Sequence, residues 1–233
     1  MLELISSSRP HPPTFDAAME ANHRIANNLS VITGLVRMRT SSICKEPGMK
    51  SGDEVRRILE EISSRLDAVA RLHRLLARRP QEASIDVAGY LRDIANGVVS
   101  SLSLPGQNEL QFAFDSGCVV PAERALPLGL IVSELISNAV KYAHPAGVAG
   151  QITLACHRGS DGQLAIEISD DGVGLPDGVD ALRHGHLGFQ LVRALAGQLG
   201  ATFAFHSDGL GLQFFLRLPA WSNLQGCSYA DEH

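Results

Sequence analysis

The sequence lacks the features that mark membrane, secreted and disulfide-linked proteins. No apolar run approaches the roughly 18 residues that cross a bilayer, and residues 1–13 lack the basic start and apolar stretch of a signal peptide. The four cysteines lie far apart without a CxxC pair, so neither a zinc site nor a disulfide framework is indicated. We therefore expect a cytoplasmic protein with reduced thiols and no membrane partner.

What is present is the composition of a globular protein, with its charge unevenly distributed. The 233 residues, 45% of them hydrophobic, suffice for one large or two modest domains. Residues 1–80 carry 13 Lys and Arg against 9 Asp and Glu, a net charge of +4, whereas residues 81–233 carry 7 against 16, a net charge of −9. The acidic part argues against nucleic-acid binding there, and the basic part could face an acidic partner.

Two helices are predicted before Pro80 from apolar residues at alternating spacings of three and four. The first runs from Phe15 to about Ile43, and the second, with Asp53 as a plausible N-cap, runs to about Leu76. An antiparallel hairpin of this kind cannot bury its single apolar seam alone. We therefore expect it to pair with a second copy as a four-helix bundle, in a homodimer.

Beyond Pro80 helices alternate with strands, which predicts an α+β sandwich with helices on one face of a mixed sheet. Helices are expected at about 87–102, 122–143 and 188–199, and strands at 110–114, 151–157, 163–169, 201–206 and 212–218. The predicted organisation is a flexible N-terminus at 1–13, a helical domain at 14–80, a second domain at 81–220 and a C-terminal tail at 221–233.

The helix predicted at 122–143 carries an unusual polar face. Glu134 and Asn138 are four residues apart, and Lys141 and Tyr142 follow within one turn. The amide oxygen of Asn138 suits Mg²⁺, and Lys141 offers a point charge to phosphates. Taken alone, this motif is better explained as the solvated side of an amphipathic helix.

A second motif is an apolar strand that runs into an acidic, glycine-rich turn. The carboxylate of Asp170 can accept a hydrogen bond from an exocyclic amine, and Gly172 and Gly174 would let the backbone approach a flat base. Alone, this DDGxG sequence could also be an ordinary turn or a calcium-like loop. The later acidic ligands of a calcium loop are missing.

A third motif is a glycine turn that opens a helix, with Gly185 and Gly188 near its start. Free backbone N–H groups and the helix dipole can hold phosphate at such a place. In their order, the three motifs resemble the N, G1 and G2 boxes of the ATPase fold shared by histidine kinases, gyrases and Hsp90-type chaperones.

The first helix resembles one branch of that group. The segment Asn22-His23-Arg24-Ile25-Ala26-Asn27-Asn28-Leu29 is similar to the phosphoacceptor box of HWE-related sensor histidine kinases. Residues 65–73, 134–145 and 187–199 also resemble patterns of that group, so the likeness covers roughly residues 15–218. His23 lies off the apolar seam, where a second domain can reach its imidazole.

The resemblance implies a two-component kinase that autophosphorylates His23 from Mg-ATP and passes the phosphoryl group to an aspartate of a response-regulator receiver domain. It implies that Asp170 reads the adenine amino group, that Gly172 and Gly174 shape the adenine pocket, and that Lys141, Gly185 and Gly188 serve the phosphates. Asn138 would hold Mg²⁺, Tyr142 would complete the nucleotide site, and Glu134 could orient the nucleophile or a metal-bound water.

Several residues depart from the family pattern and leave alternatives open. Ala26 stands where relatives usually have lysine, His186 stands where a small residue is common, and residues 176–184 are short for an ATP lid. With no sensor domain before residue 14, a separate sensor protein would deliver the signal. One alternative is a histidine phosphotransferase that shuttles phosphate between receiver domains without ATP. The other is a noncatalytic module that binds a regulator.

Overall fold

The computed structural model describes Thr33, Gly34, Val36, Arg37, Thr40 and residues 51–77, 83–104, 106–145, 148–175, 187–207 and 209–221. Its contacts form two compact units, Met1–Gly48 and Met49–His233. In the first unit the described residues are helical, as predicted, and the rest of that predicted helix lies outside the described residues. The second unit holds every element discussed below.

The first of these elements is helix α2, Gly52–Ala77. The Ser51 hydroxyl accepts a hydrogen bond from the Glu54 N–H at 3.2 Å, and the Glu54 carboxylate accepts one from the Ser51 N–H at 3.1 Å. This is a reciprocal capping box, so Ser51 is the N-cap and the expectation of Asp53 was wrong. Asp53 lies in the first turn, where a negative charge still favours the helix dipole.

The remaining elements largely match the predicted ones. The helices are α3 (Val87–Leu102), α4 (Ala122–Asn138), the π-helix η1 (Ala139–Ala143) and α5 (Leu187–Gln198). The strands are β1 (Ser84–Asp86), β2 (Asn108–Phe114), β3 (Val119–Pro121), β4 (Gly150–Arg158), β5 (Leu164–Asp170), β6 (Thr202–Ser207) and β7 (Leu212–Leu218). The three-residue strands β1 and β3 were not predicted, and the helix expected to Ala143 changes to π-helix after Asn138.

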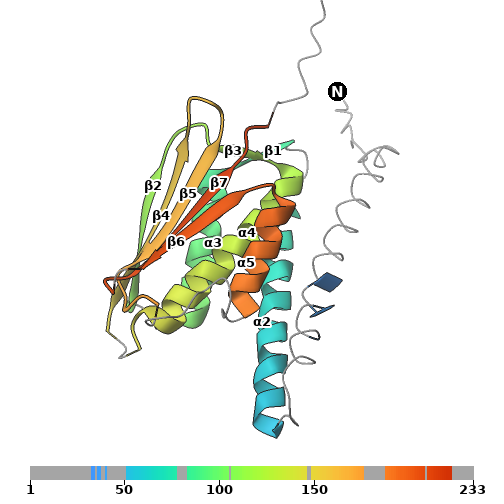
Figure 1. Ribbon diagram of the computed structural model, residues 1–233, viewed down its shortest axis with the longest axis vertical. Helices are drawn as coiled ribbons and strands as arrows, with labels where there is room; N and C mark the ends of the chain where they lie inside the picture. The colour runs from blue at the N-terminus through green and yellow to red at the C-terminus, as the bar shows by residue number, and fades with distance from the viewer. Residues whose placement is uncertain are drawn as a thin grey trace, which may run out of the picture. The chain divides into compact units, whose positions relative to one another are not determined.

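The main sheet is mixed, as the sequence predicted. Its strand order is β2-β4-β5-β7-β6, with β2 and β4 parallel and the other neighbours antiparallel. Helices α3, α4 and α5 cover one face of this sheet, and α4 lies between the other two (Figure 1). The α+β fold is therefore confirmed.

The core lies between the sheet and these helices. Alternating exposure along β7 turns Phe214, Leu216 and Leu218 inward, where each is at most 1% exposed. Helix α4 is apolar on most of its circumference because it contacts the sheet, both neighbouring helices and α2. This burial fixes α4 firmly beside the end of β5, where the acidic turn begins.

Helix α2 packs against α4 within the second unit. The domain boundary that the sequence placed near Pro80 stays a prediction. Cys118 and Cys156 are buried free thiols, and Cys44 and Cys227 lie outside the described residues. Among the helices described, none is both long and apolar enough to span a bilayer.

Candidate functional site: the acidic turn and the end of helix α4

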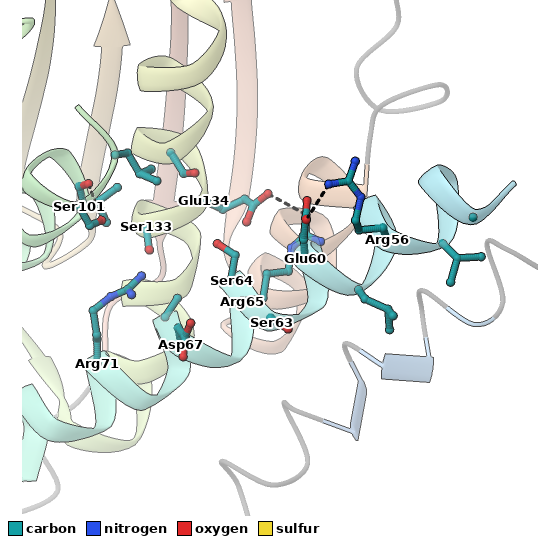
Figure 2. Close-up of a pocket in the computed structure, with 17 residues that line it drawn as sticks. Arg56, Glu60, Ser63, Ser64, Arg65, Asp67, Arg71, Ser101, Ser133 and Glu134 are labelled. Carbon is teal, nitrogen blue, oxygen red and sulfur yellow. Dashed lines mark hydrogen bonds and ion pairs between the residues drawn. The ribbon is translucent and has the colours of Figure 1, made fainter. Parts of the chain in front are cut away.

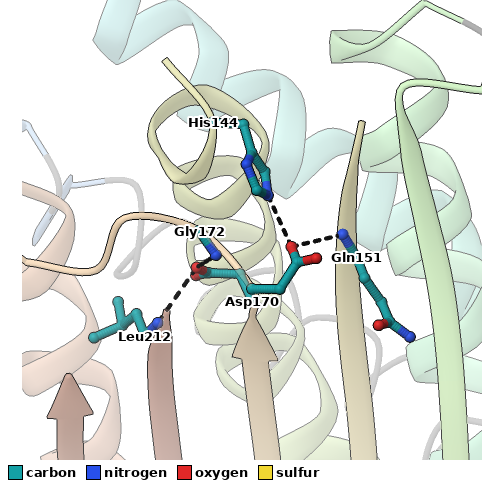
Figure 3. A network of polar contacts seen from close by, with 6 residues as sticks. His144, Gln151, Asp170, Gly172 and Leu212 are labelled. Atoms are coloured by element: carbon teal, nitrogen blue, oxygen red, sulfur yellow. Dashed lines mark hydrogen bonds and ion pairs between the residues drawn. The ribbon is translucent and has the colours of Figure 1, made fainter. Parts of the chain in front are cut away.

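Asp170 is the last residue of strand β5, and one of its two carboxylate oxygens is fixed by hydrogen bonds. Its Oδ1 accepts hydrogen bonds from the Gly172 N–H at 3.0 Å and the Leu212 N–H at 3.3 Å (Figure 3). Within the described part of the chain, Oδ2 accepts no hydrogen bond. Burial raises the pKa of Asp170 above its usual value, although both N–H groups and the nearby His144 act in the opposite direction. The carboxylate is thus oriented, and one oxygen can accept a further donor.

The neighbouring Asp171 makes a different set of contacts. Its Oδ1 lies 2.8 Å from His144 Nε2 and accepts a hydrogen bond of 2.8 Å from the Gln151 N–H (Figure 3). Slight burial raises the pKa of Asp171, but these two partners outweigh it and hold the pKa below its usual value. The Asp171 carboxylate is therefore used in contacts within the protein, whereas Oδ2 of Asp170 can still accept a hydrogen bond from a ligand.

The glycines of the turn lie against protein backbone. A Cβ on Gly172 would collide with the backbone of Ala143, and the Val173 N–H donates to the Ala143 carbonyl at 2.9 Å. Gly174 lies beside Ser207, whose hydroxyl accepts a hydrogen bond from the Leu175 N–H at 2.8 Å. Gly172 thus lets the acidic turn approach the end of η1. From the sequence alone, this glycine is explained only by the close approach of a base.

The polar residues predicted on one helix face lie on two kinds of helix. Asn138 is half-buried at the last position of α4, whereas Lys141 and Tyr142 are exposed on η1, with Tyr142 at 63%. A π-helix advances more residues per turn than an α-helix and is frequent at functional sites. Lys141 and Tyr142 are consequently presented to solvent after the half-buried Asn138.

Glu134 lies away from solvent and is paired. Its Oε1 accepts a hydrogen bond of 3.0 Å from Arg65 Nη2 on α2, and the two side chains are 14% and 13% exposed (Figure 2). A Cβ on Gly188 would collide with the same Glu134 oxygen, so this carboxylate lies at the start of α5. The structure therefore brings together Glu134 and Gly188, two of the predicted site residues.

A groove of about 710 Å³ opens beside this pair, between α2, α3 and α4 (Figure 2). Of the predicted site residues, it contains only Glu134. The turn with Asp170, Gly172 and Gly174 does not line it. The groove is therefore a separate feature of the α2 junction.

Two predicted site residues, His23 and Gly185, lie outside the described residues, as do Ala26, His186 and the whole predicted lid at 176–184. Sequence reasoning missed the partners of the site, Arg65 for Glu134 and His144 for Asp171. The sequence gives a weak indication of the His144–Asp171 pair, because His144 directly follows the first motif and Asp171 lies inside the second. Arg65 lies 69 residues from Glu134, and local spacing gives no sign of their contact.

Comparison with known protein families gives two matches along the chain. Residues 20–102 match the histidine kinase family, and residues 123–222 match the histidine kinase-, DNA gyrase B-, and HSP90-like ATPase family. The second match contains the acidic turn, the polar residues of α4 and η1, and Gly188. It therefore indicates an ATP-binding domain.

Curated relatives extend over both matched regions. The chain is 28% identical over 205 residues to blue-light-activated histidine kinase 2 of Erythrobacter litoralis, covering 86% of this chain and 56% of that protein. It is 30% identical over 208 residues to the sensor histidine kinase PdtaS of Mycobacterium tuberculosis, covering 86% of this chain and 38% of that protein. The chain thus spans about half of these relatives' lengths or less.

Solved structures share the arrangement of elements. The histidine kinase domain of the Erythrobacter litoralis blue-light activated histidine kinase superposes with a TM-score of 0.63 at 26% identity, over 88% of this chain and 94% of that domain. Sequence family, relatives and fold agree on both regions. The chain therefore carries the two regions of a histidine kinase, a histidine kinase family region at residues 20–102 followed by a histidine kinase-, DNA gyrase B- and HSP90-like ATPase domain at residues 123–222.

Proposed function

We propose that this chain transfers the γ-phosphoryl group of Mg-ATP to His23 and then to an aspartate of a response-regulator receiver domain. The observation that carries this proposal is the Asp170 carboxylate. It is half-buried at a strand end, with Oδ1 fixed by two N–H groups and Oδ2 open to the adenine amino group. An acceptor fixed in this way discriminates adenine from bases that lack the amino group.

The donor set fits a magnesium ion carried largely by the nucleotide. No cluster of three or more His, Cys, Asp or Glu side chains suited to a metal occurs among the described residues. Mg²⁺ usually keeps several waters and takes one or two protein oxygens plus phosphates, so the Asn138 amide would serve as its protein ligand. When bound, the ion would offset negative charge on the phosphates.

The remaining site residues would bind the phosphates. Lys141 supplies a positive charge from the exposed η1, and Gly188 places backbone N–H groups at the start of α5, where the helix dipole favours anions. Gly185 would extend that backbone cradle, and Tyr142 would border it. Gly172 and Gly174 would keep the acidic turn in place beneath the adenine.

His23 would act as the nucleophile. The ring nitrogen without a proton would form the N–P bond as the bond from the γ-phosphorus to the bridging oxygen breaks, with ADP leaving. Glu134 would orient the imidazole, or a water on the metal, once Arg65 no longer engages it. In the proposed homodimer, the basic helical region would meet the acidic pocket of the receiver domain.

Labelling with γ-labelled ATP and Mg²⁺ tests the proposal. We expect an acid-labile, base-stable label that is lost in His23→Ala. Label from a phosphorylated receiver but not from ATP would favour the phosphotransferase, and a His23 that is never labelled would leave only regulator binding.

The role of Asn138 has its own test. Asn138→Ala should abolish labelling from ATP but preserve acceptance from a phosphorylated receiver, because only the first reaction needs metal-bound nucleotide. Asn96→Ala, at an exposed asparagine of α3, is the matched control and should leave both reactions unchanged. Equal loss of both reactions in Asn138→Ala would contradict the assignment.

A further inference from the structure

A polar contact joins the end of the α4–η1 helix to the acidic turn. His144 follows η1 directly, and its Nε2 lies 2.8 Å from Oδ1 of Asp171. The same oxygen accepts the Gln151 N–H at 2.8 Å, and the Asp171 N–H donates to the Gln151 carbonyl at 3.3 Å. Asp171 therefore connects three segments: the helix end, the acidic turn and the start of β4.

The His144 imidazole packs closely against Gly150. A Cβ on Gly150 would collide with Cδ2 of the His144 ring, and would lie too close to Nε2 as well. The His144 side chain is 21% exposed, so most of the ring is packed against protein. Any other residue at position 150 would force this ring to move.

Backbone contacts next to the pair hold the same junction. The Val173 N–H donates to the Ala143 carbonyl, and Gly172 lies directly against Ala143. The His144–Asp171 pair is the side-chain part of this junction. On one side of it, six residues back along the helix, is Asn138, and on the other side, one residue back along the strand, is Asp170.

We propose that His144 is a positioning residue for the nucleotide, because its bond to Asp171 sets the place of the Asp170 carboxylate relative to Asn138. The inference rests on the proposed function, since it concerns how the same ATP site is held. His144 does not itself touch the nucleotide. It acts through Asp171 and the turn, and Gly150 is the residue that makes room for it.

The distance between the adenine acceptor and the metal ligand matters for binding the whole nucleotide. If the turn shifts, adenine and phosphates can no longer be engaged together, and ATP binds less tightly. Phosphoryl transfer from the nucleotide that does bind depends on His23 and the phosphate ligands, and neither residue of the pair is assigned to that step. The pair should therefore affect KM more than kcat.

His144→Phe tests this with a ring of similar shape that cannot hydrogen-bond. We expect the KM for ATP, and the Kd of Mg-ADP measured by calorimetry, to rise about tenfold, with kcat within about twofold. His144→Gln keeps an N–H donor near Nε2 and should restore KM to within about threefold. Asp171→Ala also removes the acceptor of the Gln151 N–H, so it should raise KM at least as much as His144→Phe, and the double variant should be no worse than Asp171→Ala alone.

The chain offers a matched control in a second His–Asp pair. His157 Nδ1 lies 3.2 Å from Asp115 Oδ2, away from the acidic turn, and both side chains are about half exposed. His157→Phe should leave KM and Kd unchanged. If His144→Phe binds and uses ATP like the wild type, the inference is overturned and the proposed function stands. If the wild type binds no nucleotide, both are overturned.

Discussion

Helix α4 and its π-helical end make two acid–base contacts that differ in nearly every respect. Glu134 pairs with Arg65 of α2 across 69 residues, and both side chains are at most 14% exposed. His144 pairs with Asp171 across 27 residues, and Asp171 is 52% exposed. The first contact holds α2 against the ATPase domain, whereas the second joins the end of η1 to the acidic turn, two parts of the proposed nucleotide site.

The two contacts also differ in what catalysis requires of them. The proposed role of Glu134 needs its carboxylate to be free, so the Arg65 contact would have to open during the reaction. The proposed role of His144 needs its contact to persist. Arg65 carries a cost in this state, because its Nε and Nη1 are buried without a hydrogen-bond partner among the described residues. Glu61 of the same helix, whose Oε2 lies 3.8 Å from Arg65 Nη1, is an acceptor to which Arg65 could turn.

The largest effect is expected at Glu134 itself. Glu134→Gln keeps an oxygen that can accept from Arg65 but removes the carboxylate, so autophosphorylation should fall about 100-fold or more through kcat. The Kd of Mg-ADP should stay within about threefold, because Glu134 is not assigned to the adenine. Single-turnover labelling and calorimetry measure the two effects. A variant with normal kcat would show that Glu134 serves only the contact with α2.

Arg65 should affect stability rather than nucleotide binding. Arg65→Met breaks a mostly buried ion pair, which costs about 1–3 kcal/mol after allowing for partial solvent access, or roughly 3–10 °C in Tm. The KM for ATP should not change, because α2 does not line the acidic turn. Thermal unfolding and steady-state kinetics measure the two quantities.

Arg56 provides the control for that variant on the same helix. Its contacts to Asp53 and Glu60 are 3.4 and 3.9 Å long, and its side chain is 68% exposed. Exposed pairs of this kind contribute little, so Arg56→Met should change stability by less than about 0.5 kcal/mol. Equal losses in Tm for Arg56→Met and Arg65→Met would contradict the structural role of the Arg65 contact.

Much of this arrangement was predictable because burial is periodic. The apolar spacing predicted α3, α5 and the five strands of the main sheet, and the resemblance of the three motifs to a known family implied the ATPase fold. The Ser51–Glu54 capping box is also visible in the sequence as S-x-x-E, although Asp53 is the cap predicted from the sequence. Local pattern therefore determined most of the elements.

The parts that could not be predicted depend on tertiary approach. Nothing local to Glu134 indicates Arg65, and nothing local to Gly150 indicates that it accommodates the His144 ring. Strands β1 and β3 have only three residues each, too few for alternation to be recognised. The π-helix at Ala139–Ala143 ends against the acidic turn, where the Val173 N–H donates to the Ala143 carbonyl, and local residue propensities do not indicate that contact.

Lowering the pH should protonate the two aspartates of the turn in a fixed order. The pKa of Asp170 is raised by burial and that of Asp171 is lowered by its partners, so Asp170 takes up a proton first as the pH falls. Protonation weakens its ability to accept the adenine amino group. We expect adenosine, which has no phosphates to titrate, to bind progressively more weakly as the pH falls from about 7 into the usual titration range of a carboxyl group, at about pH 4. Among the described residues, His144 and Asp171 are the other titratable side chains that act on Asp170, so the measurement is repeated in His144→Phe and in Asp171→Asn.

Persistence of the pH effect in both variants would assign it to Asp170, and its loss in one variant would assign it to the side chain replaced there. A flat affinity in the wild type over this range would contradict the role of Asp170 as the adenine acceptor.

The smallest effect on stability and on ATP kinetics is expected from the His157–Asp115 pair. This pair tests whether the location of a His–Asp contact matters more than its residue types. This pair repeats the chemistry of His144 and Asp171, but at 54% and 50% exposure and away from the nucleotide turn. His157→Phe should change the free energy of unfolding by less than about 0.5 kcal/mol and leave ATP kinetics untouched. The two pairs consist of the same residue types. A rise in KM in His144→Phe but not in His157→Phe would therefore show that the effect comes from the junction between η1 and the acidic turn.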